Sequence, residues 1–267
     1  MSHKPRKRFG QHFLHDQHII QRIIAAIAPD EPTPIVEIGP GLGALTLPLL
    51  QATRSLDVIE IDRDLARRLA DDCSEAGALQ IHTSDVLKFD FCGLGKGKIK
   101  VVGNLPYNIS TPLLFHLLDQ IHCIEAMIFM MQKEVVDRMC ARPDCRDYGR
   151  LSVMVQSQCA VRRLFNVAPG AFTPAPRVAG SIVRLTPKPD TSPDIHDLEI
   201  FSEVVKQAFS QRRKTIRNSL KNIFPETVFF ELGINPSVRA ENLSIDDFIK
   251  LANFLHDTHK PQLKNCG

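Results

Sequence analysis

The sequence lacks three features that would assign the chain to a special class of protein. None of its apolar runs reaches the roughly 18 residues that a membrane-spanning helix needs, so we expect no transmembrane segment and no membrane partner. The basic opening Met-Ser-His-Lys-Pro-Arg-Lys-Arg is not followed by an apolar stretch, which argues against a secretory signal. Seven cysteines occur without a C-x-x-C pair, a pattern that favours reduced thiols in a cytoplasmic protein over a disulfide framework or a metal site.

The composition is that of a soluble globular protein with a hydrophobic core. Of the 267 residues, 43% are hydrophobic and 24% are charged, and this length suffices for one ordinary domain with a small appendage. A net charge of +3 does not by itself predict a nucleic-acid partner. The basic residues are nevertheless concentrated in two clusters: Lys4, Arg6, Lys7 and Arg8 in the N-terminal arm, and Arg212, Arg213, Lys214, Arg217 and Lys221 further along.

A strand, a glycine turn, a helix and a second strand follow one another between residues 35 and 60. This order is the opening unit of a doubly wound parallel sheet, and it predicts an α/β fold. The first strand is 35–39, the helix 45–50 and the second strand 56–60. Further strands are expected at 79–82, 99–102, 126–131 and 181–185, with helices near 64–73, 111–119 and 133–141. Residues 150–166 are ambiguous and could begin as a helix and continue as a strand.

Three prolines in residues 187–193 indicate a linker, beyond which the pattern is helical only. We therefore expect an α/β domain at 1–187 and a small helical domain at 188–267. In the latter, the i, i+4 spacing of Arg213, Arg217 and Lys221 predicts a basic stripe along one helix. Ser244 and Asp247 are spaced as a capping box for the last helix.

The glycine turn fits two kinds of cofactor site. Gly39, Gly41 and Ala44 match the dinucleotide spacing G-x-G-x-x-A, and Glu60 lies where an acid binds ribose hydroxyls. NAD enzymes and methyltransferases share this layout, so the turn alone leaves the choice between them open.

Two further acids favour S-adenosylmethionine. Glu37 lies inside the first strand, and Asp85 follows the third strand, where a carboxylate can receive the amine of an adenine ring. Acids after the second and third strands are typical of S-adenosylmethionine sites. Asp85 could instead be a helix N-cap, and Glu60 a solvated acid at the end of a strand.

The tetrapeptide Asn104-Leu105-Pro106-Tyr107 follows the fourth strand, at the sheet edge where ligands bind. An adenine amine is a poor nucleophile because its lone pair is delocalised into the ring. The Asn104 side-chain oxygen and the carbonyl of Leu105 or Pro106 can accept both amine hydrogens and direct the lone pair at a sulfonium methyl. Tyr107 can stack on the flipped base. On its own, the tetrapeptide could also be a plain turn between strand and helix.

Five segments, in this order, closely resemble motifs of the rRNA adenine N6,N6-dimethyltransferases that modify the small ribosomal subunit. They are residues 6–14 (RKRFGQHFL), 37–43 (EIGPGLG), 103–110 (GNLPYNIS), 172–178 (FTPAPRV) and 211–220 (QRRKTIRNSL). The likeness spans essentially the whole chain. It implies a Rossmann-like class I methyltransferase sheet with a small C-terminal all-helical domain.

The resemblance also implies an activity. S-adenosylmethionine would donate methyl groups to the N6 amines of two adjacent adenosines in the 3′-terminal hairpin of small-subunit (16S) rRNA, as part of small-subunit biogenesis. The partner would be this rRNA or a pre-30S particle. We expect a monomer that needs no metal and binds no DNA.

Motif by motif, the resemblance assigns residues to roles. The cofactor pocket would contain His12, Leu14, Gly39, Glu60, Asp85 and Asn104. His12 stands where many relatives carry Asn, which leaves open whether its side chain or its backbone contacts the cofactor. Phe172 would form a second stacking face for the base beside the catalytic tetrapeptide, although such a residue before Thr-Pro-Ala-Pro is by itself more typical of a core anchor. The RNA contacts would come from Arg6, Lys7, Arg8, Arg213, Arg217 and Lys221.

Other interpretations remain at this point. A basic stripe is often only a solvated helix face. Relatives that methylate one adenosine of large-subunit RNA share the tetrapeptide, but residues 107–110 and 211–220 favour the small-subunit type. A non-catalytic RNA-binding or assembly factor is disfavoured because Asn104, Glu60 and Asp85 are all present. An NAD oxidoreductase is disfavoured because no residue set for hydride transfer is recognisable.

Overall fold

The computed structural model describes residues 12–189 and 194–263, with the backbone alone for 259–263. Internal contacts divide the chain into two compact units. The sheet unit extends to Val136 and includes Ala160–Pro187, whereas the helical unit combines Asp137–Cys159 with the chain from Lys188 onward. The sequence predicted a single boundary at residue 187. The helical unit also takes in residues 137–159, because α6 (Arg150–Gln158) packs against α7 (Leu198–Ala208).

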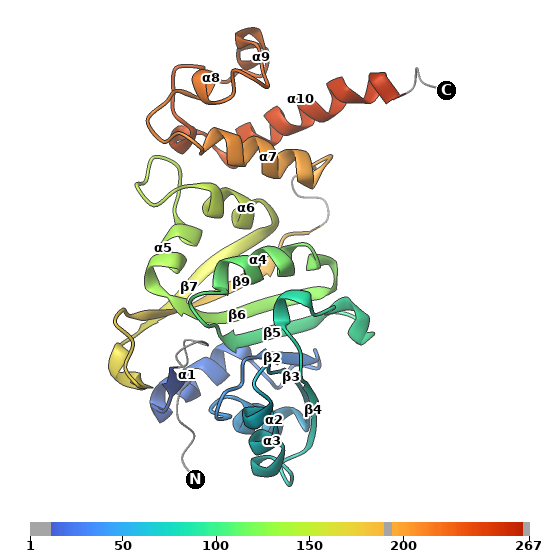
Figure 1. The fold of residues 1–267 in the computed structure, drawn as a ribbon, viewed down its shortest axis with the longest axis vertical. Helices are drawn as coiled ribbons and strands as arrows, with labels where there is room; N and C mark the ends of the chain where they lie inside the picture. Colours follow the sequence, from blue (N-terminus) through green and yellow to red (C-terminus); the bar gives the residue numbers. More distant parts are fainter. Residues whose placement is uncertain (1–11, 190–193, 264–267) are drawn as a thin grey trace. The chain divides into compact units, whose positions relative to one another are not determined.

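The central sheet has seven strands in the order β4-β3-β2-β5-β6-β9-β7 (Figure 1). Their bounds are β2 Ile35–Ile38, β3 Ser55–Ile59, β4 Ala78–His82, β5 Ile99–Asn104, β6 Ile124–Gln132, β7 Cys159–Val167 and β9 Gly180–Pro187. Strands β4, β3, β2, β5 and β6 pair in parallel, and β9 runs antiparallel to β6. The predicted α/β class is confirmed, and the ambiguous stretch is a helix, α6, that continues directly into β7.

The chain order reverses between β2 and β5. Strands β3 and β4 follow on one side of β2, and β5 and β6 on its other side. Connections that leave neighbouring strands in opposite directions open a crevice at the carboxyl ends of those strands, which is where ligands bind in such sheets. Here the crevice lies beyond Ile38 and Asn104, the last residues of the two strands.

Among the described residues, the sheet unit includes the helices α1 (Gln17–Ile27), α2 (Thr46–Thr53), α3 (Arg63–Asp72) and α4 (Ser110–Leu118). Helix α1 begins at Asp16, whose side chain accepts a hydrogen bond from the Ile19 N–H at 3.1 Å. It buries Ile20, Ile23 and Ile27, which share one helical face. Between α4 and β6 lies a short 3-10 turn, η4 (Ile121–Cys123), and α5 (Lys133–Cys140) follows β6.

Lys100, fully buried in β5, holds the C-terminal end of α1. Its ammonium donates to the carbonyl oxygens of Ile27 and Ala28 at 3.3 and 3.1 Å and pairs with the Glu31 carboxylate. A cation is favoured at a helix C-terminus, and the ion pair avoids an uncompensated buried charge. The hydrogen bond and charge of Lys100 in turn lower the pKa of Glu31. These contacts fix α1, and with it the strand that directly precedes it.

That strand, β1 (Phe13–Leu14), pairs antiparallel with β8 (Phe172–Thr173). Leu14 lies opposite Phe172, and both side chains are buried in the hydrophobic core of the sheet unit. Two of the sequence motifs, far apart in the chain, therefore meet as a two-stranded ribbon.

The helical unit is built from α6, α7, α8 (Ile216–Ser219), α9 (Glu226–Glu231) and α10 (Ile245–Leu263). Its core contains the fully buried rings of Phe201, Phe229 and Phe248. The predicted capping box of α10 is confirmed: Ser244 N–H donates to the Asp247 carboxylate at 3.0 Å, and Asp247 N–H to the Ser244 hydroxyl at 3.2 Å. Within the described ranges, no helix combines the length and apolarity that a bilayer crossing requires.

The predicted basic stripe on one helix is wrong. Helix α7 ends at Ala208, and α8 has only four residues, so Arg213 precedes it and Lys221 follows it. The cause is tertiary hydrogen bonding, because the Ile216 N–H donates to Val238 O at 2.7 Å rather than to the preceding turn. The periodic spacing of the three cations in the sequence gives no indication that a distant segment will bond to the backbone here in place of a longer helix.

The expectation that all cysteines are reduced thiols is wrong for one pair. Cys92 and Cys123, separated by 31 positions, form a disulfide, while Cys73, Cys140, Cys145 and Cys159 do not. Cys92 begins the 3-10 turn η3 (Cys92–Leu94), and the fold brings its Cα to 5.5 Å from that of Cys123 at the end of η4. Such proximity arises only in the folded chain, so cysteine spacing could not indicate it.

Candidate active site

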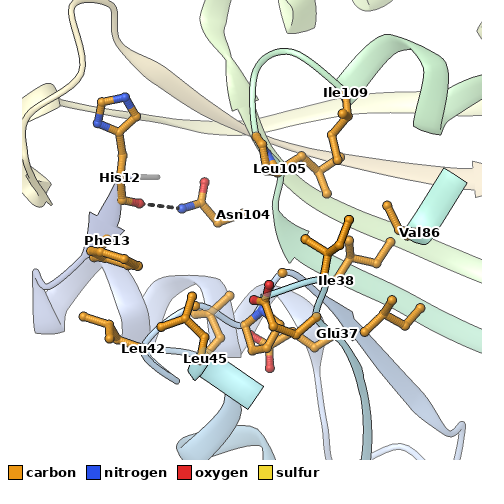
Figure 2. Close-up of a pocket in the computed structure, with 18 of the residues that line it drawn as sticks. His12, Phe13, Glu37, Ile38, Leu42, Leu45, Val86, Asn104, Leu105 and Ile109 are labelled. Carbon is orange, nitrogen blue, oxygen red and sulfur yellow. Dashed lines mark hydrogen bonds between the residues drawn. The ribbon is translucent and has the colours of Figure 1, made fainter. Parts of the chain in front are cut away.

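A cavity of about 180 Å³ lies at the crevice between β2 and β5 (Figure 2). The segments that follow β2, β3, β4 and β5 line it, and β1 and β8 contribute Phe13, Leu14 and Phe172. All of these segments belong to the sheet unit. The cavity is therefore formed where consecutive parallel strands end.

The turn after β2 brings the backbone close to the cavity. Gly39 and Gly41 have φ angles of +63° and +59°, a left-handed conformation that side chains other than glycine rarely adopt. A Cβ added at Gly41 would lie 3.3 Å from the Phe13 ring, so glycine also lets β1 pack on the turn. Strand β2, the glycine turn that follows it and strand β1 thus form one wall of the cavity.

Two buried carboxylates lie behind this wall. Glu37 is 2% exposed and accepts a hydrogen bond from the Thr46 hydroxyl at 2.7 Å. Burial raises the pKa of Glu37 to about 7, the Thr46 hydrogen bond opposes this shift, and the negative charge of Glu60 adds to it. Burial also raises the pKa of Glu60, against hydrogen bonds from backbone N–H groups that include that of Asp62, at 2.9 Å. The site therefore holds closely spaced acidic groups that disfavour each other's charge.

Asp85 follows β4 and has two roles in the structure. Its carboxylate accepts a hydrogen bond from the Leu87 N–H at 3.0 Å and caps the short turn η2 (Val86–Lys88), as the N-cap interpretation predicted. It also lines the cavity, beside the buried Val86. One carboxylate oxygen accepts the Leu87 N–H, and the second oxygen is a further acceptor of the same side chain.

The tetrapeptide leaves β5 at the opposite wall. The Asn104 amide donates to the carbonyl oxygen of His12 at 3.2 Å, and Figure 2 shows its side-chain oxygen pointing away from that bond. Leu105 N–H donates to Met130 O at 3.0 Å, and the Pro106 carbonyl accepts from Ile109 N–H at 3.2 Å. The Asn104 side chain is thus oriented by the N-terminal segment and by backbone contacts of its neighbours.

His12 and Tyr107 lie together at the mouth of the cavity. The His12 ring donates through Nδ1 to Pro174 O at 2.8 Å, and its centroid is 5.8 Å from that of Tyr107. Tyr107 is half-buried, and burial raises the pKa of its hydroxyl. The phenol is therefore neutral at physiological pH and offers an uncharged face to a ligand.

The charges of the lining fit a cationic ligand with an apolar part. Glu37, Glu60 and Asp85 line the cavity, and none of the described residues around it is lysine or arginine. Leu42 and Ile61, at 39% and 51% exposure, are apolar side chains left uncovered at its edge. S-adenosylmethionine has these properties, because it joins a sulfonium and an ammonium to an adenosine.

The profile described as Ribosomal RNA adenine dimethylase matches residues 2–257. The chain belongs to the ribosomal RNA adenine dimethylase family. It is therefore a methyltransferase that uses S-adenosylmethionine to dimethylate adenine in rRNA. This assignment settles the cofactor choice that the glycine turn left open, and the NAD oxidoreductase interpretation is wrong.

Relatives support this membership over nearly the full length. "Ribosomal RNA small subunit methyltransferase A" from Nitrosococcus oceani is 51% identical over 95% of this chain and 97% of its own, and that from Coxiella burnetii is 51% identical over 94% and 98%. Among solved structures, a dimethyladenosine transferase from Plasmodium falciparum has a TM-score of 0.81 at 27% identity, covering 92% of this chain and 98% of its own. The 23S rRNA methyltransferase ErmE has a TM-score of 0.70 at 25% identity, covering 91% and 99%.

The structure brings the predicted cofactor and catalytic residues of this dimethylase together in one cavity. They are His12, Leu14, Gly39, Glu60, Asp85, Asn104, Leu105, Pro106, Tyr107 and Phe172. Phe172 is 5% exposed and lies in the hydrophobic core, so it is also the core anchor that its motif suggested when taken alone. The individual roles of these residues stay predictions.

Sequence reasoning missed several apolar residues of the lining: Phe13, Leu42, Ile61 and Val86. Each directly adjoins a residue or turn that was identified. The sequence signal that could have identified these residues is their position next to a functional acid or glycine, where a bound ligand would cover the apolar side chain. Without the fold, such a residue cannot be told from an ordinary core position.

The predicted RNA-binding residues fall into two groups. Arg6, Lys7 and Arg8 lie outside the described residues. Arg213, Arg217 and Lys221 are exposed in the helical unit, and Arg217 pairs with the Glu226 carboxylate at 2.8 Å. The three side chains do not share one helix. Phosphate contact therefore stays a prediction for each of them separately.

Proposed function

We propose that this methyltransferase dimethylates two adjacent adenosines in the 3′-terminal hairpin of small-subunit (16S) rRNA during subunit biogenesis. The observation that carries the proposal is the position of Asn104-Leu105-Pro106-Tyr107 at the end of β5, on the wall of an acidic cavity. The relatives that are about half identical over nearly the whole chain bear small-subunit names. The 23S rRNA methyltransferase ErmE is the structurally less similar of the two solved relatives, with a TM-score of 0.70 against 0.81 for the dimethyladenosine transferase.

In the cofactor pocket, each carboxylate has a separate task. When bound, S-adenosylmethionine supplies an electrophilic methyl group on a positively charged sulfur. Glu60, at the end of β3, accepts hydrogen bonds from ribose hydroxyls, and Asp85 accepts one from the adenine amine. Leu42 and Ile61 cover the apolar faces of the ligand, while His12 and Leu14 close the pocket from the N-terminal side. Because the Asn104 amide holds the His12 backbone, His12 acts by position and its ring supports Pro174.

The target amine is held by acceptors of the tetrapeptide. The amide nitrogen of Asn104 is engaged with His12, so its side-chain oxygen accepts one amine hydrogen. The Pro106 carbonyl already accepts the Ile109 N–H, and this favours the Leu105 carbonyl as the second acceptor. Two acceptors draw the amine toward a tetrahedral geometry and direct its lone pair at the methyl group, and positioning of this kind supplies most of the catalysis.

Aromatic rings position the flipped base. Tyr107 lies half-exposed at the cavity mouth and stacks on one face of the adenine. Phe172 is more deeply buried, and only the edge that lines the cavity can reach the base, as a second face. We expect Phe172 to contribute mainly by holding β8 against β1.

The RNA partner is held by cations. Arg213, Arg217 and Lys221, together with Arg6, Lys7 and Arg8, contact phosphates of the rRNA or of a pre-30S particle. We expect the enzyme to act as a monomer in the cytoplasm, where such rRNA is found, to bind no DNA and to need no metal for methyl transfer. The support for phosphate contact is charge and exposure for Arg213, Arg217 and Lys221, and charge alone for the three residues of the N-terminal arm.

The deciding experiment is methyl transfer from labelled S-adenosylmethionine to small subunits purified without this modification. Nucleoside analysis should find N6,N6-dimethyladenosine, and nuclease mapping should place it in the 3′-terminal hairpin. Large subunits treated in a parallel reaction should take up no label, and transfer to them instead of to the small subunits would contradict the substrate assignment. Titration calorimetry with S-adenosylmethionine separates an enzyme from a non-catalytic assembly factor, because the latter would not bind the cofactor.

A further inference from the structure

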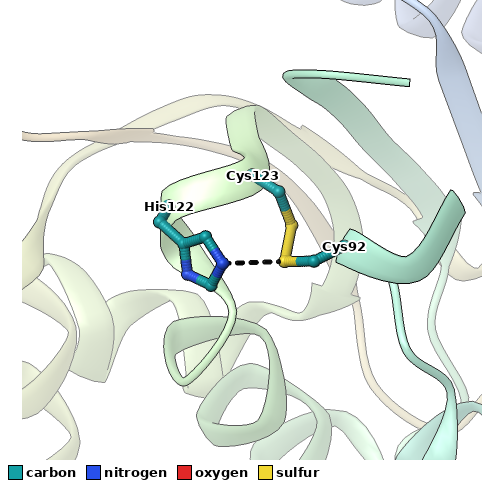
Figure 3. A group of neighbouring side chains, drawn as sticks. All are labelled: Cys92, His122 and Cys123. Carbon is teal, nitrogen blue, oxygen red and sulfur yellow. Dashed lines mark hydrogen bonds between the residues drawn. A yellow bond between two sulfur atoms is a disulfide. The ribbon is translucent and has the colours of Figure 1, made fainter. Parts of the chain in front are cut away.

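Three metal-ligating side chains converge on the sheet unit away from the cavity (Figure 3). The sulfur atoms of Cys92 and Cys123 and a ring nitrogen of His122 all lie within 4.8 Å of one another. The Cys92 Sγ is 3.3 Å from His122 Nε2. Cys123 is buried, Cys92 is half-buried and His122 is exposed, so the cluster reaches the surface on one side.

Gln120 holds the cluster together independently of the bond between the sulfurs. The side-chain oxygen of Gln120 accepts from the N–H groups of Phe91 and Cys92, at 2.7 and 3.4 Å. The Gln120 carbonyl oxygen lies 3.2 Å from the Cys123 sulfur. These contacts fix η3 beside η4, with 5.5 Å between the two Cα atoms. The ligands would therefore remain neighbours after reduction.

Reduction changes what the cluster can bind. A dithiol reductant gives two electrons and two protons to the Cys92–Cys123 disulfide, which becomes two thiols while the reductant becomes a disulfide. Thiolates at about 2.3 Å from a tetrahedral Zn²⁺ stand ~3.8 Å apart, a separation that the fixed Cα distance permits by side-chain rotation alone. Two sulfurs and an imidazole suit Zn²⁺ and not Mg²⁺ or Ca²⁺, which take oxygen ligands.

We propose that Cys92, His122 and Cys123 form a Zn²⁺ site in the reduced protein, with solvent as the fourth ligand. On binding, each thiol releases its proton to solvent and both sulfurs ligate the ion as thiolates. In the reverse exchange, a small-molecule disulfide takes two electrons from the two thiolates, is released as two thiolates of its own, and leaves Cys92 and Cys123 joined and unable to hold the ion. The exposed ring of His122 provides the path by which the ion enters.

The site would act as a clamp on a segment of the cavity wall. Asp85 and Val86 line the cavity, and Phe89 O, three residues further on, accepts from His116 Nε2 at 2.8 Å and Gln120 Nε2 at 3.1 Å. A bridge from Cys92 to Cys123 closes the end of this segment against α4 and η4. The ion would thus be structural, and it would take no part in methyl transfer.

The test uses the full-length protein, reduced and freed of metal, titrated with Zn²⁺ against a chromogenic chelator. We expect one equivalent to bind, and Co²⁺ in its place to give a thiolate charge-transfer band. Cys92→Ser and Cys123→Ser should each weaken Zn²⁺ binding about 100-fold or more. Loss of a residue that only hydrogen-bonds to a metal ligand already lowers metal affinity about 10- to 100-fold, and loss of the ligand itself should lower it at least as much. The oxidised protein should lose this thiolate-dependent binding.

Two further variants keep the result interpretable. His122→Gln replaces an exposed side chain, so a loss of Zn²⁺ affinity there, with unchanged circular dichroism, identifies a ligand and not a folding defect. Cys140→Ser with Cys145→Ser removes two other thiols and should change nothing. Failure of the reduced wild type to bind one equivalent, or equal binding by Cys92→Ser, would overturn the site. Either result leaves the proposed methyl transfer untouched, because that activity is measured separately.

Discussion

The sheet unit and the helical unit carry their functional residues in different ways. Around the cavity, side chains are held at the ends of parallel strands, and Glu37, Glu60 and Leu105 are almost fully buried. In the helical unit, Arg213 and Lys221 are exposed on irregular segments that flank a four-residue helix. The first arrangement suits chemistry that depends on position, the second an electrostatic contact that tolerates small displacements. Substitutions in the two units should therefore have different effects. Single changes in the cavity should strongly reduce methyl transfer or cofactor affinity, whereas changes in the helical unit should weaken RNA binding slightly and in a salt-dependent way.

The largest effect is expected at Asn104. Asn104→Ala removes the acceptor for the adenine amine and should lower the methyl-transfer rate roughly 10²- to 10³-fold, as for loss of an oriented catalytic hydrogen bond. Because the helical unit is unchanged, binding to small subunits should persist. Single-turnover transfer and filter binding measure the two separately. Parallel loss of RNA binding would show that the two regions are not separable.

The fold of the sheet unit followed from sequence because its central strands β2, β5 and β6 are mainly apolar and the turn after β2 carries glycine. Residues far apart, such as Leu14 and Phe172, were grouped by their motifs and do meet in β1 and β8. Three features were out of reach because each depends on a contact made only after folding. These are the inclusion of residues 137–159 in the helical unit, the hydrogen bond from Ile216 to Val238 that replaces a helix, and the Cys92–Cys123 disulfide.

Ionisation of Glu37 should appear in the pH dependence of stability. Its pKa of about 7 in the folded protein lies above the unfolded value of 4.5, so the folded state binds more protons between these values. Stability is therefore greatest below the unfolded pKa and falls as pH rises through 7, by about 3 kcal/mol at most. The raised pKa of Glu60 acts in the same direction. Urea unfolding of the cofactor-free protein between pH 5 and 8 measures this decline.

A matched variant isolates that contribution. Gln at position 37 can still accept the Thr46 hydroxyl but cannot ionise. Glu37→Gln should therefore flatten the decline of unfolding free energy with pH, while Asp64→Asn, at an exposed position of α3, should leave the decline unchanged. An identical slope in wild type and Glu37→Gln would mean that the buried carboxyl does not titrate in this range.

Glu60→Gln should have a smaller effect, confined to the cofactor. An amide is a weaker acceptor than a carboxylate, and loss of a charged hydrogen bond typically costs about 1.5–3 kcal/mol, so affinity for S-adenosylmethionine should fall at least tenfold. Titration calorimetry gives this value directly. Transfer at saturating cofactor should be nearly normal, unlike in Asn104→Ala. Unaltered affinity would exclude Glu60 from ligand contact.

The smallest effect is expected in the helical unit, and it distinguishes cations that are otherwise similar. Arg213→Ala with Lys221→Ala removes two exposed cations and should weaken binding to small subunits a few-fold, while the slope of log K against log[salt] falls by about one per lost phosphate contact. Arg217→Ala also removes the ion-pair partner of Glu226. Its effect on RNA binding would therefore combine the loss of one cation with repulsion of phosphate by the unpaired Glu226 carboxylate. Arg67→Ala with Arg68→Ala on α3 removes the same net charge from the sheet unit and serves as the control. An equal change of slope in both double variants would mean that only total charge matters, and that the helical unit offers no particular RNA surface.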